Sequence, residues 1–408
     1  MLKPVLIFKS YFFFLMLSLF LTYFTSSGVI SYGLPILSCV MVFLYFVVGQ
    51  FRLKNNEWLI IFFYFSFTSL GLFYYYINPY KGYVISQYMV FLLSFPFSVM
   101  CLICLERYLN YEEFCNFINK LVGFFALGQL LVTVGQFSRY LYGFNFKVTE
   151  EYQNIMMISG TFFNSNDLSV VVVLMAFIYK FTSKFQPKWL NLIIWMILAY
   201  LLLVTGSRLC LFLFALILMS MGQFTYRKIL AISSLIFAIV MLLVLFGNLV
   251  VDVDHPLYRI VYRINSINMM ITDGVGSDES VSDRSSFYMY FIRHIQDIGI
   301  GSISIGNYFK YANHSYHFSP LFFSNPHAFI IEIAYWMGWS GLIIYLVLYF
   351  MMVLKSKFNI LFVLISFSTL FVSSSLMGNM VYFLLVAMAS WICYLSSNQV
   401  LKLDSKVL

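Results

Sequence analysis

The fold is decided where the sequence reads Asn325-Pro-His327-Ala-Phe-Ile-Ile-Glu332-Ile-Ala-Tyr-Trp-Met-Gly338-Trp-Ser-Gly341. This stretch begins in the longest polar segment of the chain and ends inside an apolar run. Proline suits the first turn of a helix, where its missing N–H is not needed. The pattern therefore predicts that His327 stands near the N-terminal end of a membrane helix, at the boundary between water and lipid.

The composition indicates the class of protein. Of the 408 residues, 62% are hydrophobic, 21% are aromatic and only 10% are charged, whereas a soluble domain has about 25% charged residues. These values are typical of a polytopic membrane protein. The net charge of +8 then reports orientation in the membrane, and we expect no nucleic-acid partner.

Twelve apolar runs approach the length of about 20 residues that a helix needs to cross a bilayer. They are centred near residues 14, 43, 67, 95, 128, 174, 197, 215, 239, 338, 366 and 386. The first run, 11–24, has the pattern of a signal peptide, but no clear cleavage site follows, so we interpret it as an anchor. The sequence thus predicts an all-α polytopic membrane protein with about twelve transmembrane helices.

Basic residues predict the orientation, because lysine and arginine concentrate in cytoplasmic loops. With the N-terminus inside, the inner segments hold fifteen of the 24 basic residues. These fifteen are Lys3, Lys9, Arg52, Lys54, Arg107, Lys120, Lys180, Lys184, Lys188, Arg227, Lys228, Lys355, Lys357, Lys402 and Lys406. The short outer segments hold only Lys81, Arg139, Lys147 and Arg208. Both termini are therefore predicted to be cytoplasmic.

Three regions follow from this layout. Residues 1–249 hold helices one to nine, residues 250–325 form a large outer loop, and residues 326–408 hold helices ten to twelve. A shorter outer segment covers about 139–165. The large loop carries four of the five histidines and many charges. A channel or carrier rarely needs such a loop, whereas an enzyme that acts on a lipid-linked substrate does.

Short amphipathic helices are predicted inside the large loop. Apolar residues recur at helical spacing over 257–268, with Arg259 and Arg263 one turn apart on the opposite side. A second helix is predicted over 283–298, with Asp283 as a favourable N-cap residue.

The apolar stripe of this second helix consists of Phe287, Phe291, Ile295 and Ile298. The helical period places Arg284 on that stripe and Arg293 opposite it. Arg284 would face the membrane, where a lone cation needs an anion, and Arg293 would be solvated.

Three residues are candidates for chemistry near the membrane boundary. Arg208, in Thr205-Gly-Ser-Arg208 between two apolar runs, either extends to the lipid headgroups or binds a phosphate with its planar guanidinium group. His327 either packs at a helix end or acts as a base. Glu332 is an intramembrane carboxylate, which is a functional candidate by default, or it is near enough to the surface to be hydrated.

No metal and no cofactor are expected. The six cysteines lie in or beside apolar runs, so neither a disulfide framework nor a zinc site is predicted. We interpret Cys101-x-x-Cys104 as a packing feature. His314-x-x-His317 has the spacing of two metal ligands, but no third ligand has a persuasive spacing.

Several motifs occur together in a specific order. Gly160-Thr-Phe-Phe-Asn164-Ser-Asn166-Asp-Leu opens a membrane helix and is followed by Thr205-Gly-Ser-Arg208, Asp283-Arg284, Asp297-Ile-Gly-Ile-Gly301 and His327 with Gly338 and Gly341. This set, over roughly 160–345, resembles the bacterial O-antigen ligase and O-antigen polymerase superfamily.

The resemblance implies a glycosyltransferase of the GT-C type in the bacterial inner membrane, with its active site on the periplasmic side. The donor would be a glycan on undecaprenyl pyrophosphate. Ligases join that glycan to lipid A–core, and polymerases join it to another lipid-linked repeat. Membrane lipid and a chain-length regulator protein are the other expected partners.

The resemblance also assigns roles to residues. It implies that His327, Arg208 and Arg284 are functional, together with either Arg259 or Arg263. One departure is Ala328, because the residue after the histidine is usually Asn, Ser or Gln in the family. In chemical terms, a neutral imidazole can accept the proton of the acceptor hydroxyl, and arginines can stabilise the leaving pyrophosphate. A metal-independent, inverting transfer is therefore expected.

The acceptor is left open between two possibilities. A composition rich in Phe, Tyr, Ile and Asn favours a polymerase over a ligase. A lipid-linked-sugar flippase is the rival of a different class, but it should show charges in several spans and related halves, whereas the polar residues here gather on one side. A non-catalytic membrane scaffold is the remaining alternative.

Overall fold

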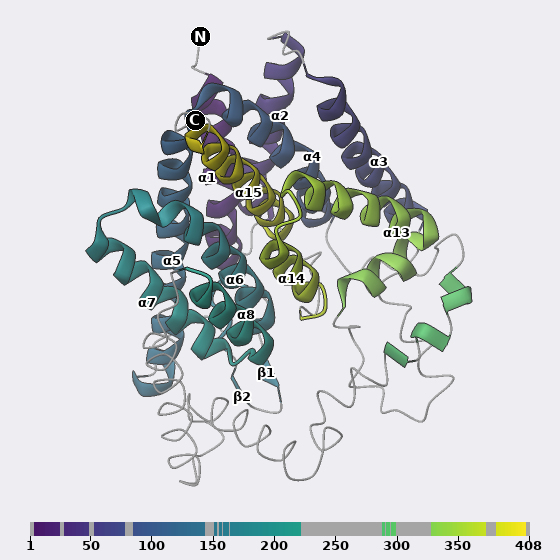
Figure 1. Cartoon of the computed structure of the whole chain (residues 1–408). Helices are drawn as coiled ribbons and strands as arrows, with labels where there is room; N and C mark the ends of the chain where they lie inside the picture. The colour runs from purple at the N-terminus through teal and green to yellow at the C-terminus, as the bar shows by residue number, and fades with distance from the viewer. Residues whose placement is uncertain are drawn as a thin grey trace.

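The computed structural model is a bundle of helices (Figure 1). It describes residues 4–24, 28–48, 53–77, 85–142, 151–152, 155–156, 158–162, 164–221, 288–289, 291–293, 295–298, 328–372 and 381–404.

Eleven of the twelve predicted centres fall inside a described helix. These helices are α1 (Pro4–Phe24), α2 (Gly28–Val48), α3 (Asn55–Ile77), α4 (Ile85–Tyr108), α5 (Tyr111–Tyr142), α6 (Ser165–Thr182), α7 (Lys188–Thr205), α8 (Arg208–Met219), α13 (Phe329–Lys355), α14 (Ile360–Thr369) and α15 (Tyr382–Asp404). The twelfth centre, near residue 239, lies outside the described residues. The prediction of an all-α membrane protein is confirmed.

Within the described part of the chain, six segments are long and apolar enough to cross a membrane. They are Pro4–Leu21, Asn55–Ile77, Tyr111–Ser138, Ser165–Phe185, Lys188–Thr205 and Met337–Lys355. Shorter apolar helices include α8 and α14. The total of twelve spans therefore stays a prediction, and so do the boundaries of the three predicted regions.

Helix α1 is an integral part of the bundle. The hydroxyl of Tyr11 donates to the carbonyl oxygen of Ser94 (3.2 Å) and lies 3.2 Å from Oγ of Ser98, both on α4. These buried contacts agree with the interpretation of the first apolar run as an anchor.

Helix α6 lies at the centre of the bundle. Nearly every residue along it is buried, and it packs against α5, α7, α8, α14 and α15. A helix that is apolar all round is typical of a core position. Before it, a two-stranded antiparallel pair forms from β1 (Glu151–Tyr152) and β2 (Ile155–Met156), inside the predicted outer segment 139–165. Helix α5 extends to Tyr142 and so takes in the start of that segment.

The first turn of α1 and the last turns of α15 lie at the same end of the bundle, which we call the terminal end (Figure 1). Lysines gather there on aromatic rings, with Lys9 5.4 Å from the ring centre of Phe117 and Lys184 4.9 Å from that of Tyr111. Such contacts are favourable cation–π interactions. Basic residues from distant parts of the chain thus share one end, as their predicted common side requires.

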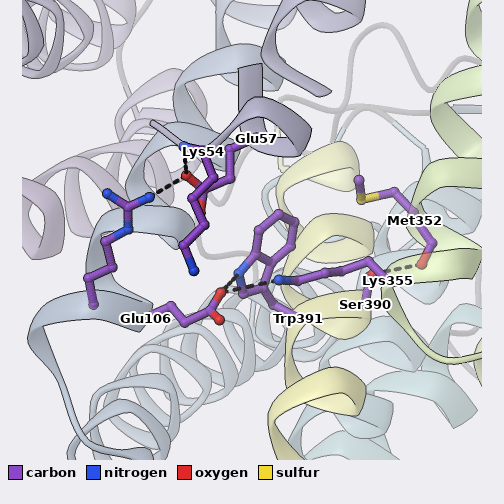
Figure 2. A network of polar contacts seen from close by, with 8 residues as sticks. Lys54, Glu57, Glu106, Met352, Lys355, Ser390 and Trp391 are labelled. Carbon is purple, nitrogen blue, oxygen red and sulfur yellow. Dashed lines mark hydrogen bonds and ion pairs between the residues drawn. The ribbon is translucent and has the colours of Figure 1, made fainter. Parts of the chain in front are cut away.

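A charged network ties several helices together at the terminal end (Figure 2). One carboxylate oxygen of Glu106, on α4, accepts from Nζ of Lys355 (3.2 Å) and from Nε1 of Trp391 (2.7 Å). The same ammonium group lies 3.8 Å from the ring centre of Tyr394. The carboxylate of Glu106 therefore joins helices α4, α13 and α15.

A second ion pair lies beside this network (Figure 2). Glu57, in the first turn of α3, accepts from the main-chain N–H of Lys54 (2.7 Å) and from the guanidinium group of Arg107. The first of these bonds satisfies a free N–H at the start of the helix. The second joins the start of α3 to the end of α4.

All six cysteines lie in described helices, and each is buried and free of a disulfide bond. Cys101 and Cys104 belong to the hydrophobic core. The interpretation of the Cys-x-x-Cys spacing as packing is therefore confirmed.

The predicted helix over 283–298 is only partly described. Residues 288–289 and 291–293 are helical, but 295–298 form a 3-10 helix, η3 (Ile295–Ile298). Phe291 packs on the core and Arg293 is exposed, as predicted. The prediction that an α-helix extends to residue 298 is therefore wrong at its end, where the side chain of Ile295 is 42% exposed. The tighter turn of a 3-10 helix changes the direction of each side chain.

Candidate functional site

Arg208 is the first residue of α8. Helix α7 ends at Gly206, whose φ of 66° is left-handed, a conformation that glycine adopts without steric cost. Ser207 then forms the N-cap of α8. The two helices are therefore joined by a tight turn, as the sequence predicted, and the side chain of Arg208 is partly buried there.

Helices α6 and α8 run side by side in the same direction. Oγ of Ser169 donates to Sγ of Cys210 (3.2 Å) near their starts, and Nζ of Lys180 donates to Oγ of Ser220 (2.7 Å) near their ends. Both helices therefore begin at the same end of the bundle, which we call the loop end. Helix N-termini carry partial positive charge, so the positive ends of both helices lie at the end of the bundle that carries Arg208.

The chain before α6 is held by two glutamines of α5. Gln129 bonds to Thr161 and Gln136 bonds to Gly160, each through both atoms of its amide group. Asn164 then forms the N-cap of α6 by accepting from the N–H of Asn166 (2.8 Å). Sequence reasoning missed both glutamines, although two amides inside a membrane span are an available signal, since polar groups there are costly.

Helix α13 begins two residues after His327. Ala328 is its N-cap and is buried, and the N–H of Phe329 donates to the carbonyl oxygen of Leu370 (2.8 Å) at the end of α14. The ring of Phe329 packs on that of Phe383, with centres 5.1 Å apart. The helix start is therefore anchored in the interior. Because Phe329 is its first residue, α13 begins where the prediction that His327 stands near the N-terminal end of a helix requires.

Helix α13 is bent back on itself at Gly338. This residue has φ 63° and ψ −164°, a conformation restricted to glycine. The rings of Phe329 and Tyr345 lie only 5.4 Å apart, whereas a straight helix would separate these residues by about 24 Å. The conformation of Gly338 therefore makes a sharp turn within α13.

Gly341 completes this turn. A Cβ atom there would lie 2.2 Å from Cβ of Met337, so the glycine permits a close approach between two parts of α13 itself.

Aromatic contacts place α14 relative to α6. The ring of Phe362 lies 6.3 Å from that of Phe177. Helix α14 begins at the terminal end, close after Lys355, and α6 ends there, so the two helices are antiparallel. Ser169 on α6 and Leu370 at the end of α14 each lie eight residues from this contact, in the direction of the loop end. Since both helices rise about 1.5 Å per residue, the two residues lie at the same height in the bundle.

The register of α14 on α6 places the segment after Arg208 and the segment after His327 at the same height along the bundle. Ser169 contacts Cys210, two residues after Arg208, and Leu370 binds Phe329, two residues after His327. Helix α14 also packs directly against α8. The described segments that follow Arg208 and His327 thus meet around the loop end of α14.

The remaining predicted residues are placed as follows. Glu332 lies in the first part of α13, before the turn at Gly338. His327, Arg259, Arg263 and Arg284 lie outside the described residues, so their convergence with Arg208 stays a prediction.

The expectation of no metal also stays a prediction. Among the described residues, no group of three His, Cys, Asp or Glu side chains could hold a metal ion. All five histidines lie outside that part of the chain.

Comparison with known proteins adds one finding. Residues 192–346 match the family model Wzy_C, described as O-antigen ligase. No curated protein and no solved structure matches the chain. The matched segment includes Arg208, the large predicted loop and the first part of helix α13 with its turn at Gly338. Residues 192–346 are therefore similar to the O-antigen ligase family, which supports the resemblance inferred from the sequence motifs.

Proposed function

We propose that this protein is an O-antigen polymerase. It joins oligosaccharide repeats that are carried on undecaprenyl pyrophosphate, by metal-independent, inverting glycosyl transfer. The observation that carries the proposal is the common level of the segments after Arg208 and His327, within the part of the chain that matches the family model. A base and a phosphate-binding arginine must lie within reach of one sugar pyrophosphate.

The chemistry assigns one role to each side chain. The neutral imidazole of His327 accepts the proton of the acceptor hydroxyl as the new bond forms between that oxygen and the anomeric carbon. The bond from the anomeric carbon to the pyrophosphate oxygen breaks, and the configuration is inverted. Arg208 and Arg284, with Arg259 or Arg263, stabilise the leaving pyrophosphate. Glu332 helps to orient the polar side chains of the site.

The proposed location is the inner membrane of a bacterium, with both termini in the cytoplasm and the active site on the periplasmic side. The support is the gathering of lysines at the terminal end, because basic residues favour the cytoplasmic side. The loop end, with Arg208, then faces the periplasm. A chain-length regulator is the proposed protein partner.

Purified protein with a lipid-linked donor tests the two central roles. We expect His327→Ala to lower turnover by about 100-fold or more, the usual contribution of a general base, while donor binding is retained. Arg208→Ala should weaken donor binding by about tenfold, since a charge-assisted hydrogen bond is lost. Turnover should persist in EDTA.

The matched control is Arg293→Ala, which removes an exposed arginine and should leave turnover and donor binding unchanged. Normal turnover in His327→Ala would remove the assignment of the base. Donor binding without turnover in the unaltered protein would favour a scaffold, and movement of the donor across a vesicle membrane would favour a flippase.

An O-antigen ligase is the second candidate, and the family model that matches residues 192–346, described as O-antigen ligase, favours it. Both enzymes use the same donor chemistry and differ in the acceptor. Deletion of the gene followed by gel analysis of lipopolysaccharide separates them. A single repeat on the core indicates loss of a polymerase. Core without any repeat, with polymer retained on the carrier lipid, indicates loss of a ligase.

A further inference from the structure

Helix α5 carries a buried polar stripe inside a predicted membrane span. Gln129, Thr133 and Gln136 have no exposed surface and follow the i, i+4, i+7 spacing of a single helix face. A buried amide is costly unless its donors and acceptors are bonded. The side chains of this stripe therefore need specific partners, and both glutamines find them in the segment before α6.

Each glutamine pairs with one residue of that segment through two hydrogen bonds. Gln136 donates to the carbonyl oxygen of Gly160 (2.9 Å) and accepts from its N–H (3.0 Å). Gln129 donates to Oγ1 of Thr161 (2.6 Å) and accepts from the N–H of Thr161 (3.0 Å). Main-chain groups that are buried outside a helix are satisfied in this way.

Gly160 permits this close approach. Its φ is +60°, and a Cβ atom would lie 2.2 Å from Oε1 of Gln129. The pairing therefore depends on a glycine in a left-handed conformation. We call Gln129, Gln136, Gly160 and Thr161 the amide clamp.

We propose that Gln129 and Gln136 are positioning residues for donor binding. The amide clamp fixes the chain three residues before Asn164, the N-cap of α6. Helix α6 in turn contacts α8 through Ser169 and Cys210, two residues from Arg208. The clamp thus sets the position of the Arg208 guanidinium group without touching the donor. This inference rests on the proposed function of Arg208.

The test replaces one atom of the clamp with little change in shape. Thr161→Val keeps the main-chain N–H but removes the oxygen that accepts from Gln129, whereas Thr161→Ser keeps that oxygen. Thr68→Val is the matched control, because Thr68 is a buried threonine of α3 whose hydroxyl is also hydrogen-bonded, by donating to the main-chain oxygens of Tyr64 and Leu92.

Two quantities are measured on purified full-length protein. The first is hydrogen–deuterium exchange of residues 158–168, with α14 and α15 as internal references. The second is the kinetics of glycosyl transfer from undecaprenyl-pyrophosphate-linked glycan. In Thr161→Val we expect exchange over 158–168 to rise about tenfold, the size expected for loss of one buried hydrogen bond. KM for the donor should rise about tenfold and kcat should change less than twofold.

Thr161→Ser should restore the exchange rate over 158–168 and KM for the donor. Thr68→Val should leave KM unchanged. A purely structural role would instead raise exchange in α14 and α15 and lower the amount of active protein without a change in KM. Unchanged exchange in Thr161→Val overturns the proposal, as does faster exchange with an unaltered KM. Absence of both donor binding and turnover in the unaltered protein would instead be a failure of the proposed function.

Discussion

Charged groups join the helices at the terminal end, whereas neutral amides hold the chain at the loop end. At the terminal end, Glu106 accepts from Lys355 and Trp391 (Figure 2). At the loop end, Gln129 and Gln136 pair with the main chain before α6. Ion pairs are screened by salt, but a buried amide pair is not. The two ends should therefore respond differently to substitution and to ionic strength.

The difference also fits the proposed chemistry. Lysines at the terminal end bond to a carboxylate or pack on aromatic rings, so these contacts stabilise the packing of the helices. An amide adds no net charge, so the clamp can fix a buried segment near Arg208 without altering the charge that an anionic donor meets. The loop end is thus suited to binding a pyrophosphate, and the terminal end to holding helices together.

The largest effect is expected for Gly160→Ala. The substitution combines a left-handed φ with a Cβ atom 2.2 Å from Gln129, so it should lower the free energy of unfolding by about 3 kcal/mol. Thermal unfolding in detergent measures this change.

Gly33→Ala is its control, because nothing lies within 4 Å of the added Cβ atom there, and alanine favours a helix. Equal unfolding temperatures for the two variants would contradict the described clamp. The loss in Gly160→Ala should be the same at low and at high salt.

A smaller effect is expected for Glu106→Gln. An amide oxygen can still accept from Trp391, but the charge partner of Lys355 is lost from a site where the two side chains are 19% and 26% exposed. The free energy of unfolding should fall by about 1–2 kcal/mol. Glu112→Gln, at an exposed glutamate, should have no effect. A normal unfolding temperature would show that the carboxylate does not join these helices.

The smallest effect is expected for Arg107→Gln, which breaks the pair with Glu57 at the edge of the bundle. Partly exposed ion pairs contribute about 1 kcal/mol or less. The difference from the unaltered protein should shrink further in high salt, as measured by thermal unfolding at two ionic strengths. A loss of stability that does not shrink in high salt would remove the distinction between the two ends.

The turn that carries Arg208 could be predicted from the sequence, but the contacts that hold the neighbouring chain before α6 could not. The tight turn before Arg208 follows from Thr205-Gly-Ser, because glycine between apolar runs ends a helix. The partners of Gln129 and Gln136 lie 32 and 24 residues further along the chain, beyond the range of any local pattern. One departure from the prediction is local, since residues 295–298 form a 3-10 helix in place of the end of the expected α-helix.

The sequence by itself determined that this is a helical membrane protein, where most helices lie and which superfamily the motifs over roughly 160–345 resemble. Apolar length, basic residues and short motifs are local properties, so they can be read without a structure. Only the tertiary structure decided the turn of α13 at Gly338, the register of α14 on α6 and the amide clamp. Each of these depends on contacts between distant residues, because a glycine or a buried amide acquires its role from the atoms that surround it.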